Sequence, residues 1–169
     1  AIINVNTDPV LELSTGTDHV TGAFVETPMT SSFSTSGWIK PADGHPAAVQ
    51  TLWSAVGDSW SDNVFFVAID TTGKILVNYK ADGDLANCVT PVIFSDGGDQ
   101  SWTHVCLTAN HSTAAVQGLS IYVNGKEEVL STGGSAGSGD GNSGDTSGVT
   151  FADWDGDSAT NFAIGAGNG

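Results

Sequence analysis

The sequence contains no arginine, and its 4 lysines stand against 19 acidic residues, which gives a net charge of −15 at pH 7. Binding to a nucleic-acid backbone requires many cationic side chains that neutralise phosphates. The shortage of positive charge therefore argues against nucleic acid as a partner. It disfavours an anionic membrane surface for the same reason.

Long apolar runs are also absent. No stretch reaches the roughly 18 apolar residues that a membrane-spanning helix needs, so we expect no membrane insertion. Residues 1–8 lack the basic region and the apolar core of a secretion signal. Either a signal has already been removed or only an initiator methionine has. The first case places the protein outside the cell, and the second suits a protein of the virion surface that is released by lysis.

Cysteine is scarce, with only Cys88 and Cys106 present. A disulfide between them would contribute about 3 kcal/mol in the chain-entropy model. Two separately buried thiols are an equal alternative, because free cysteine is among the most buried residue types. At 169 residues, one domain over residues 1–169 can bury a core without a disulfide or a metal.

Helical periodicity is hard to find, and short apolar runs alternate with clusters of Gly, Ser, Thr, Asp and Asn, which is typical of an all-β sandwich. In residues 102–107 and 119–123, apolar and polar side chains alternate with the period of a half-buried strand. Asn124-Gly125 then predicts a two-residue type I′ turn. This segment therefore predicts an antiparallel sheet.

Further strands are predicted from short apolar runs bounded by turn residues. Pro91 removes a backbone donor and indicates an edge strand. Residues 131–148, which are rich in Gly, Ser and Asp, predict a long flexible loop. The predicted strands cover residues 2–5, 10–13, 20–26, 33–40, 52–56, 64–70, 74–80, 89–94, 149–151 and 161–165.

Three motifs carry a resemblance to a known family. Residues 102–105 (WTHV) and 121–126 (IYVNGK) are similar to a hairpin of laminin G-like and pentraxin-like domains, in the concanavalin A-like superfamily. Residues 32–41 and 65–79 resemble two further strands of that family, in the same order. The resemblance implies an all-β, antiparallel two-sheet jelly-roll sandwich of the concanavalin A type. It also places Trp38 and Trp102 in the core and makes His104 a structural residue.

Two further features of the family are missing here. The family disulfide pairs the cysteine that matches Cys106 with one in the strand matching residues 33–38, which contain none. Relatives also continue past residues 163–165 into a closing strand. Either residues 2–5 take its place or a sheet edge stays unpaired, and an unpaired edge favours a homo-oligomer.

Enzymatic activity is not expected. Hydrolase relatives carry the acids that cleave a glycosidic bond in an E-x-D-x-x-E strand. None of the four glutamates here is followed by an aspartate two residues later. We therefore predict no catalytic residues.

Calcium is the expected ligand of two acidic clusters, since hard cations prefer grouped oxygen ligands. Asp153, Asp155 and Asp157 alternate in a turn-prone segment close to Asn161. Asp62-Asn63 resembles a calcium-binding pair of pentraxin-like domains. The alternative for both clusters is a set of solvated turn residues.

Three tryptophans lie in or beside predicted loops, where an indole face stacks well on the apolar side of a sugar ring. They are Trp53, Trp60 and Trp154. The alternative is that each covers an edge of the core.

Together these features predict a non-catalytic surface-recognition module that binds a glycan or a surface protein with the help of Ca²⁺. The main alternative is a structural virion or filament subunit, such as a capsid decoration protein that contacts the viral capsid lattice. A glycoside hydrolase is the third alternative. Glycan binding that is lost with a chelator favours the first.

Overall fold

The computed structural model describes residues 2–4, 10–13, 20–23, 32–56, 64–81, 84–98, 100–110, 118–132 and 161–165. Throughout these segments the regular elements are β-strands, so no helix there could cross a membrane. The strands are β1 (Ile2–Asn4), β2 (Val10–Glu12), β3 (Val20–Ala23), β4 (Phe33–Ile39), β5 (Gln50–Val56), β6 (Val64–Ile69), β7 (Lys74–Ala81), β8 (Asp84–Val92), β9 (Thr103–Ala109), β10 (Leu119–Val123), β11 (Lys126–Glu127), β12 (Ser131–Thr132) and β13 (Asn161–Ile164).

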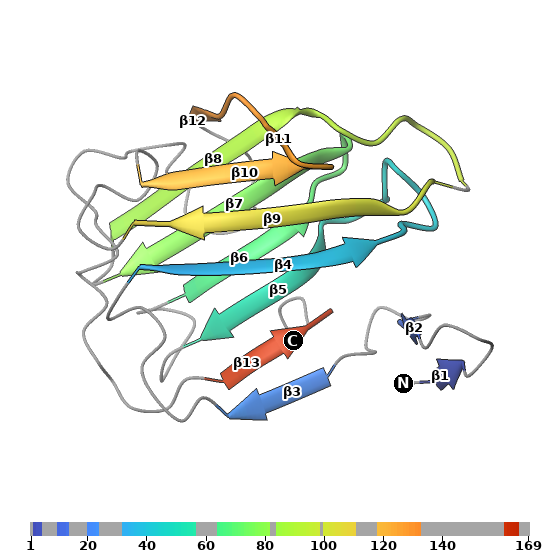
Figure 1. The fold of residues 1–169 in the computed structure, drawn as a ribbon, viewed down its shortest axis with the longest axis horizontal. Helices are drawn as coiled ribbons and strands as arrows, with labels where there is room; N and C mark the ends of the chain where they lie inside the picture. The colour runs from blue at the N-terminus through green and yellow to red at the C-terminus, as the bar shows by residue number, and fades with distance from the viewer. Residues whose placement is uncertain are drawn as a thin grey trace.

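The strands form two packed antiparallel sheets and a separate short pair. The larger sheet has seven strands in the order β12-β8-β7-β6-β5-β13-β3, and the smaller has four in the order β11-β10-β9-β4. Figure 1 shows β4, β9 and β10 lying across the front of the larger sheet. The all-β jelly-roll sandwich predicted from the sequence is therefore confirmed.

The core fills the space between the two sheets. Val105, Leu107 and Ile121 of the four-stranded sheet are completely buried, and they belong to one cluster with Val67 and Ile75 of the seven-stranded sheet. Burial follows the period-two alternation, since every second residue of β9 and β10 is buried and the residues between are half exposed. The inward positions are thus the β-branched and leucine residues that the alternation predicted.

The other face of the seven-stranded sheet is buried as well. Ala68 and Leu76 are 0% exposed, yet they lie outside the core cluster, because their neighbours Val67, Ile69, Ile75 and Val77 point into it. Val89, Ala163 and the polar Ser54 are also buried. The outward face of the four-stranded sheet differs, since its side chains reach solvent.

Two glycine turns fix the hairpins. Asn124 and Gly125 have φ values of 50° and 81°, as a type I′ turn requires, which confirms the predicted turn between β10 and β11. Gly73, with φ 75°, follows β6, where the Asp70 carboxylate accepts hydrogen bonds from the backbone N–H groups of Thr72 and Lys74 at 2.7 and 3.0 Å. The carbonyl of Gly73 in turn accepts the N–H groups of Ile93 and Phe94.

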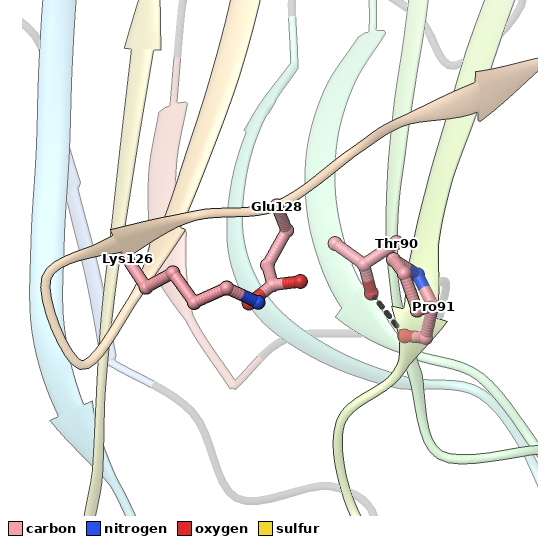
Figure 2. A network of polar contacts seen from close by, with 4 residues as sticks. All are labelled: Thr90, Pro91, Lys126 and Glu128. Atoms are coloured by element: carbon pink, nitrogen blue, oxygen red, sulfur yellow. Dashed lines mark hydrogen bonds and ion pairs between the residues drawn. The ribbon is translucent and has the colours of Figure 1, made fainter.

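The chain passes from the four-stranded to the seven-stranded sheet between β11 and β12. Figure 2 shows this crossing, with Lys126 paired to Glu128 at 3.1 Å and Thr90 on the neighbouring β8. The hydroxyl of the buried Thr90 donates to the carbonyl of Pro91 at 2.8 Å and accepts the N–H of Ile75 at 2.9 Å. β12 then pairs with Cys88 and Val89 of β8.

This pairing corrects two predictions. Ser131 and Thr132, expected in the long loop, form a strand because their backbone groups pair with β8. β8 is flanked by β7 and β12, so it is not an edge strand, and Pro91 lies past the β12 pairing. The predicted strand at 149–151 and the rest of the predicted loop, 133–148, lie outside the described residues.

β4 has one neighbour among the described strands. β1 pairs with β2, not with β4, so residues 2–4 do not take the place of a closing strand. All seven residues of β4 pair with β9, from Phe33 opposite Ala109 to Ile39 opposite Thr103. Among the described strands, β4 is therefore at an edge of the four-stranded sheet.

Candidate functional site

Trp53 does not offer a surface for a ligand. It lies on β5 with 7% of its area exposed and belongs to the core cluster. Gly37 of β4 faces it, and a Cβ atom at Gly37 would come within 3.2 Å of its ring. The prediction of Trp53 as a ligand-binding residue is therefore wrong, because the six-membered ring of its indole fills the space that Gly37 leaves between the sheets.

Most of the other predicted site residues lie outside the described part of the chain. This applies to Trp60 and Trp154 and to the acidic residues Asp62, Asn63, Asp153, Asp155 and Asp157. Asn161 begins β13, where its backbone pairs with Ala23 and Val56. The residues that are described contain no group of three or more metal-ligating side chains.

The two cysteines are free thiols in different sheets. Cys88 lies on β8 and points into the core, where burial raises the pKa of its thiol to about 12. Cys106 lies on β9 at a half-exposed, outward position. Because the two side chains point to opposite sides of the four-stranded sheet, the Cys88–Cys106 disulfide is not formed, and the alternative of two separate thiols describes the structure.

Among the described tryptophans, the exposed ones are the two that were expected in the core. Trp38 is 64% exposed and Trp102 is 49% exposed. Val105 and Leu107 point inward, so Trp102 and His104 belong to the outward set of the same alternation. The register then places Trp38 directly opposite His104. The alternation of residues 102–107 already indicated that Trp102 faces outward, whereas the family resemblance predicted that Trp38 and Trp102 lie in the core.

Four ring side chains occupy outward positions on the four-stranded sheet, and we call them the aromatic face: Trp38, Trp102, His104 and Tyr122. The rings of Trp38 and His104 are in contact, with centroids 5.2 Å apart and planes inclined at 55°. Tyr122 is half-buried on β10, two strands from Trp38. The face therefore combines two solvent-facing indoles with a supporting imidazole.

The backbone under this face is held by the adjacent turn. The N–H of His104 donates to Oδ1 of Asn124 at 3.0 Å, and the N–H of Asn124 donates to the carbonyl of His104 at 2.8 Å. On the next strand pair, the Ser120 hydroxyl donates to Oε1 of Glu127 at 2.8 Å. The two bonds with Asn124 hold the backbone of His104, whose ring is in contact with that of Trp38.

An exposed indole of this kind stacks on flat apolar surfaces, including the C–H face of a sugar ring. The serine hydroxyls of Ser34 and Ser36 are exposed at alternate positions of β4 beside Trp38, and they can donate and accept hydrogen bonds. A rigid apolar platform with polar groups at its margin can thus bind and orient a polyhydroxylated ligand.

The family follows from the whole sequence. Residues 14–168 match the laminin G-type family model described as "Concanavalin A-like lectin/glucanases superfamily". The chain belongs to this superfamily. No curated protein sequence matches this concanavalin A-like chain.

Two solved structures are similar to this chain. A sialidase CBM40 module from Ruminococcus gnavus, bound to α2,3-sialyllactose, is 15% identical, with a TM-score of 0.51 over 82% of this chain and 65% of the module. A heptameric SAP-like pentraxin from Limulus polyphemus is 14% identical, with a TM-score of 0.46 over 87% of this chain and 57% of the pentraxin. The concanavalin A-like chain thus spans less than two thirds of either length, and at these identities the likeness concerns the fold.

Proposed function

We propose that this concanavalin A-like domain is a non-catalytic, extracellular recognition module that binds glycans on its aromatic face. The observation that carries the proposal is the exposure of Trp38 and Trp102 on a strand pair whose backbone is fixed by the Asn124 turn. A large apolar ring that faces solvent marks a binding surface when several gather together.

The exposure of outward side chains on the two sheets supports a site on the four-stranded sheet. On the seven-stranded sheet the outward residues Ala68 and Leu76 are fully buried, so they offer no contact to a ligand. The four-stranded sheet presents its indoles and serine hydroxyls to solvent. The Ruminococcus gnavus module carries sialyllactose on a similar fold, which fits a glycan as the class of ligand.

We include calcium binding in this proposal on the basis of the sequence alone. Asp153, Asp155, Asp157 and Asn161, together with Asp62-Asn63, supply the oxygen ligands that Ca²⁺ prefers. The negative charge of −15 also favours the uptake of divalent cations.

A structural virion or filament subunit is the second candidate, and one observation favours it. Among the described strands β4 is at the edge of its sheet, with β9 as its one neighbour, and edge strands pair readily with another chain. In this alternative the protein takes part in a capsid lattice or a homo-oligomer.

A glycan array tests the proposed function. We expect the purified protein to bind glycans, and Trp38→Ala or Trp102→Ala to weaken that binding at least tenfold, which corresponds to about 1.4 kcal/mol. Trp38→Phe keeps a ring and should retain part of the affinity. Val92→Ala is the matched control, because Val92 is 56% exposed on the other sheet and should leave binding unchanged.

Thermal unfolding of each variant checks that the fold is intact, as expected for exposed side chains. Wild-type protein that binds no glycan, while it assembles on particles in stoichiometric amounts, would support the structural subunit. Glycan binding that is unaffected by both alanine variants would place the site elsewhere.

A further inference from the structure

The outward side chains along residues 34–40 and 102–108, which cover most of β4 and β9 and one flanking residue of each, have an unusual charge for this protein. Acidic residues outnumber lysines by 19 to 4 in the whole chain, yet the only charged side chain in this set is a lysine. From the edge strand inward, the set consists of Ser34, Ser36, Trp38 and Lys40 next to Trp102, His104, Cys106 and Thr108.

Lys40 is the residue directly after β4, close to both indoles. It follows Trp38 by two residues, so it is on the same side of the strand, and it is exposed. The last pair of the β4–β9 register is Ile39 with Thr103, so Lys40 and Trp102 are the two residues that flank the end of this ladder. Residues directly opposite have Cβ atoms about 5 Å apart, and diagonal neighbours about 7–8 Å. The ammonium group can therefore reach a ligand that stacks on either indole.

The charge of Lys40 is not neutralised by the surrounding described residues. Lys40 makes no ion pair within the described part of the chain. Lys126, by contrast, pairs with Glu128 at 3.1 Å. Asp43 is the next acidic residue along the chain, and its Oδ1 accepts the N–H of His45 at 3.0 Å. Glu127 is on β11, three strand spacings away, which is about 14 Å.

The position of Lys40 relative to the nearby acidic residues determines which charge a ligand contacts on the aromatic face. At physiological salt the screening length is about 8 Å, so the carboxylate of Glu127 acts weakly on a group beside Lys40. A charge-assisted hydrogen bond to the ammonium is roughly twice as strong as a neutral one. A cationic ligand would find no carboxylate among the outward residues of β4 and β9, and a neutral sugar would leave the ammonium without a partner.

From this arrangement we infer that the glycan recognised by the aromatic face contains a carboxylated sugar. Its apolar ring face stacks on Trp38 or Trp102, and its carboxylate pairs with Nζ of Lys40. The inference rests on the proposed glycan binding and adds the chemical class of the sugar to it. Uronic acids and sialic acids both present this combination of a ring and a carboxylate.

The test is an array on which uronic-acid oligosaccharides and sialylated glycans are each printed beside their carboxyl-reduced forms. We expect the carboxylated glycans to bind and their reduced forms to bind at least tenfold more weakly. Which of the two series binds identifies the source of the carboxylate. Added salt should weaken binding of the carboxylated glycans and leave any binding of the reduced forms unchanged.

Lys40→Gln should weaken the binding of the carboxylated glycans at least tenfold and leave the binding of the reduced forms unchanged. Lys74→Gln, on the seven-stranded sheet, changes the net charge equally and serves as the control, with affinity close to that of wild type. A loss of affinity with both variants would mean that net charge, not Lys40, is responsible, and would overturn the inference.

Equal binding of carboxylated and reduced glycans would overturn the inference and leave the proposed function standing. Absence of all glycan binding would overturn both. If the wild-type protein then dimerises in sedimentation velocity and Trp38→Ala stays monomeric, the aromatic face is occupied by a second copy of this chain.

Discussion

The buried thiol of Cys88 makes a prediction at the scale of one residue. Its pKa is raised from 9.0 to about 12 because burial penalises the thiolate. Below pH 9 the thiol is protonated in both the folded and the unfolded chain, so it adds no pH dependence. Between pH 9 and about 12 the unfolded chain releases its proton while the folded protein retains it. The free energy of unfolding therefore falls with rising pH in this window, by up to about 1.4 kcal/mol per unit.

Denaturant unfolding at a series of pH values above 8 measures this slope. Cys88→Ala should lose stability overall and show a flatter decline between pH 9 and 11 than the wild-type protein. Cys106→Ala, at an outward position of β9, is the matched control for the replacement of a cysteine by alanine. Tyrosines and lysines also titrate in this range, so the difference between wild type and variant is the relevant quantity. Parallel slopes for wild type and Cys88→Ala would contradict the prediction.

The orientation of the tryptophans shows what single residues reveal before a structure is known. The period of two in residues 102–107 was visible in the sequence, and it places Trp102 and His104 on the outward side. The exposure of Trp38 depends in addition on its pairing with His104, which joins segments distant in the sequence. Trp53 was misassigned because nothing local shows that Gly37 leaves space for its ring.

At the scale of elements, the β6–β7 hairpin requires a glycine at position 73 for two reasons: a left-handed backbone conformation and a close approach of another backbone segment. Gly73 adopts φ 75°, and a Cβ atom there would lie 2.2 Å from the carbonyl oxygen of Phe94. Gly125 in the β10–β11 turn adopts φ 81° with no atom within 4 Å of the same position. An alanine at Gly125 would therefore lose stability only through the left-handed backbone conformation. An alanine at Gly73 would lose stability through that conformation and through a steric clash as well.

Alanine at each position should reveal the difference in urea unfolding. Gly125→Ala should cost about 1–2 kcal/mol, the price of the left-handed conformation. Gly73→Ala should cost about 2–5 kcal/mol, because the overpacking against Phe94 is added. Similar losses for the two variants would mean that the segment after β8 moves aside without cost.

Elements with strong local signals were predictable, and those made by distant pairing were not. The turn at Asn124-Gly125 and the strands β4, β6, β7, β9 and β10 follow from turn residues and alternation. β12 is a strand because Ser131 and Thr132 meet Val89 and Cys88, and a Ser-Thr pair before a glycine-rich segment carries no such signal. The pairing of β1 with β2 was likewise not specified by their short apolar runs.

For the whole molecule, the net charge of −15 sets the expected response to calcium. We expect CaCl₂ to raise the melting temperature and EDTA to lower it, since a ligand that binds only the folded state stabilises by about 2.7 kcal/mol at a concentration 100 times its Kd. Asp155→Asn should reduce the calcium effect, whereas Asp96→Asn, at an exposed position between β8 and β9, should not. MgCl₂ at equal ionic strength controls for screening, and equal melting temperatures in CaCl₂ and EDTA would contradict the prediction.

The position of β13 has a consequence for the order in which the protein assembles. β13 lies between β3 and β5, so Asn161 pairs with Ala23 on one side and with Val56 on the other. The ribosome delivers β3 and β5 long before β13, and contacts this distant in sequence form only after a large loop-closure entropy has been overcome. Among the described strands, β13 is the only neighbour of β3, so β3 stays unpaired with them until β13 has been synthesised. The seven-stranded sheet can therefore close around β3 only after β13 has left the exit tunnel.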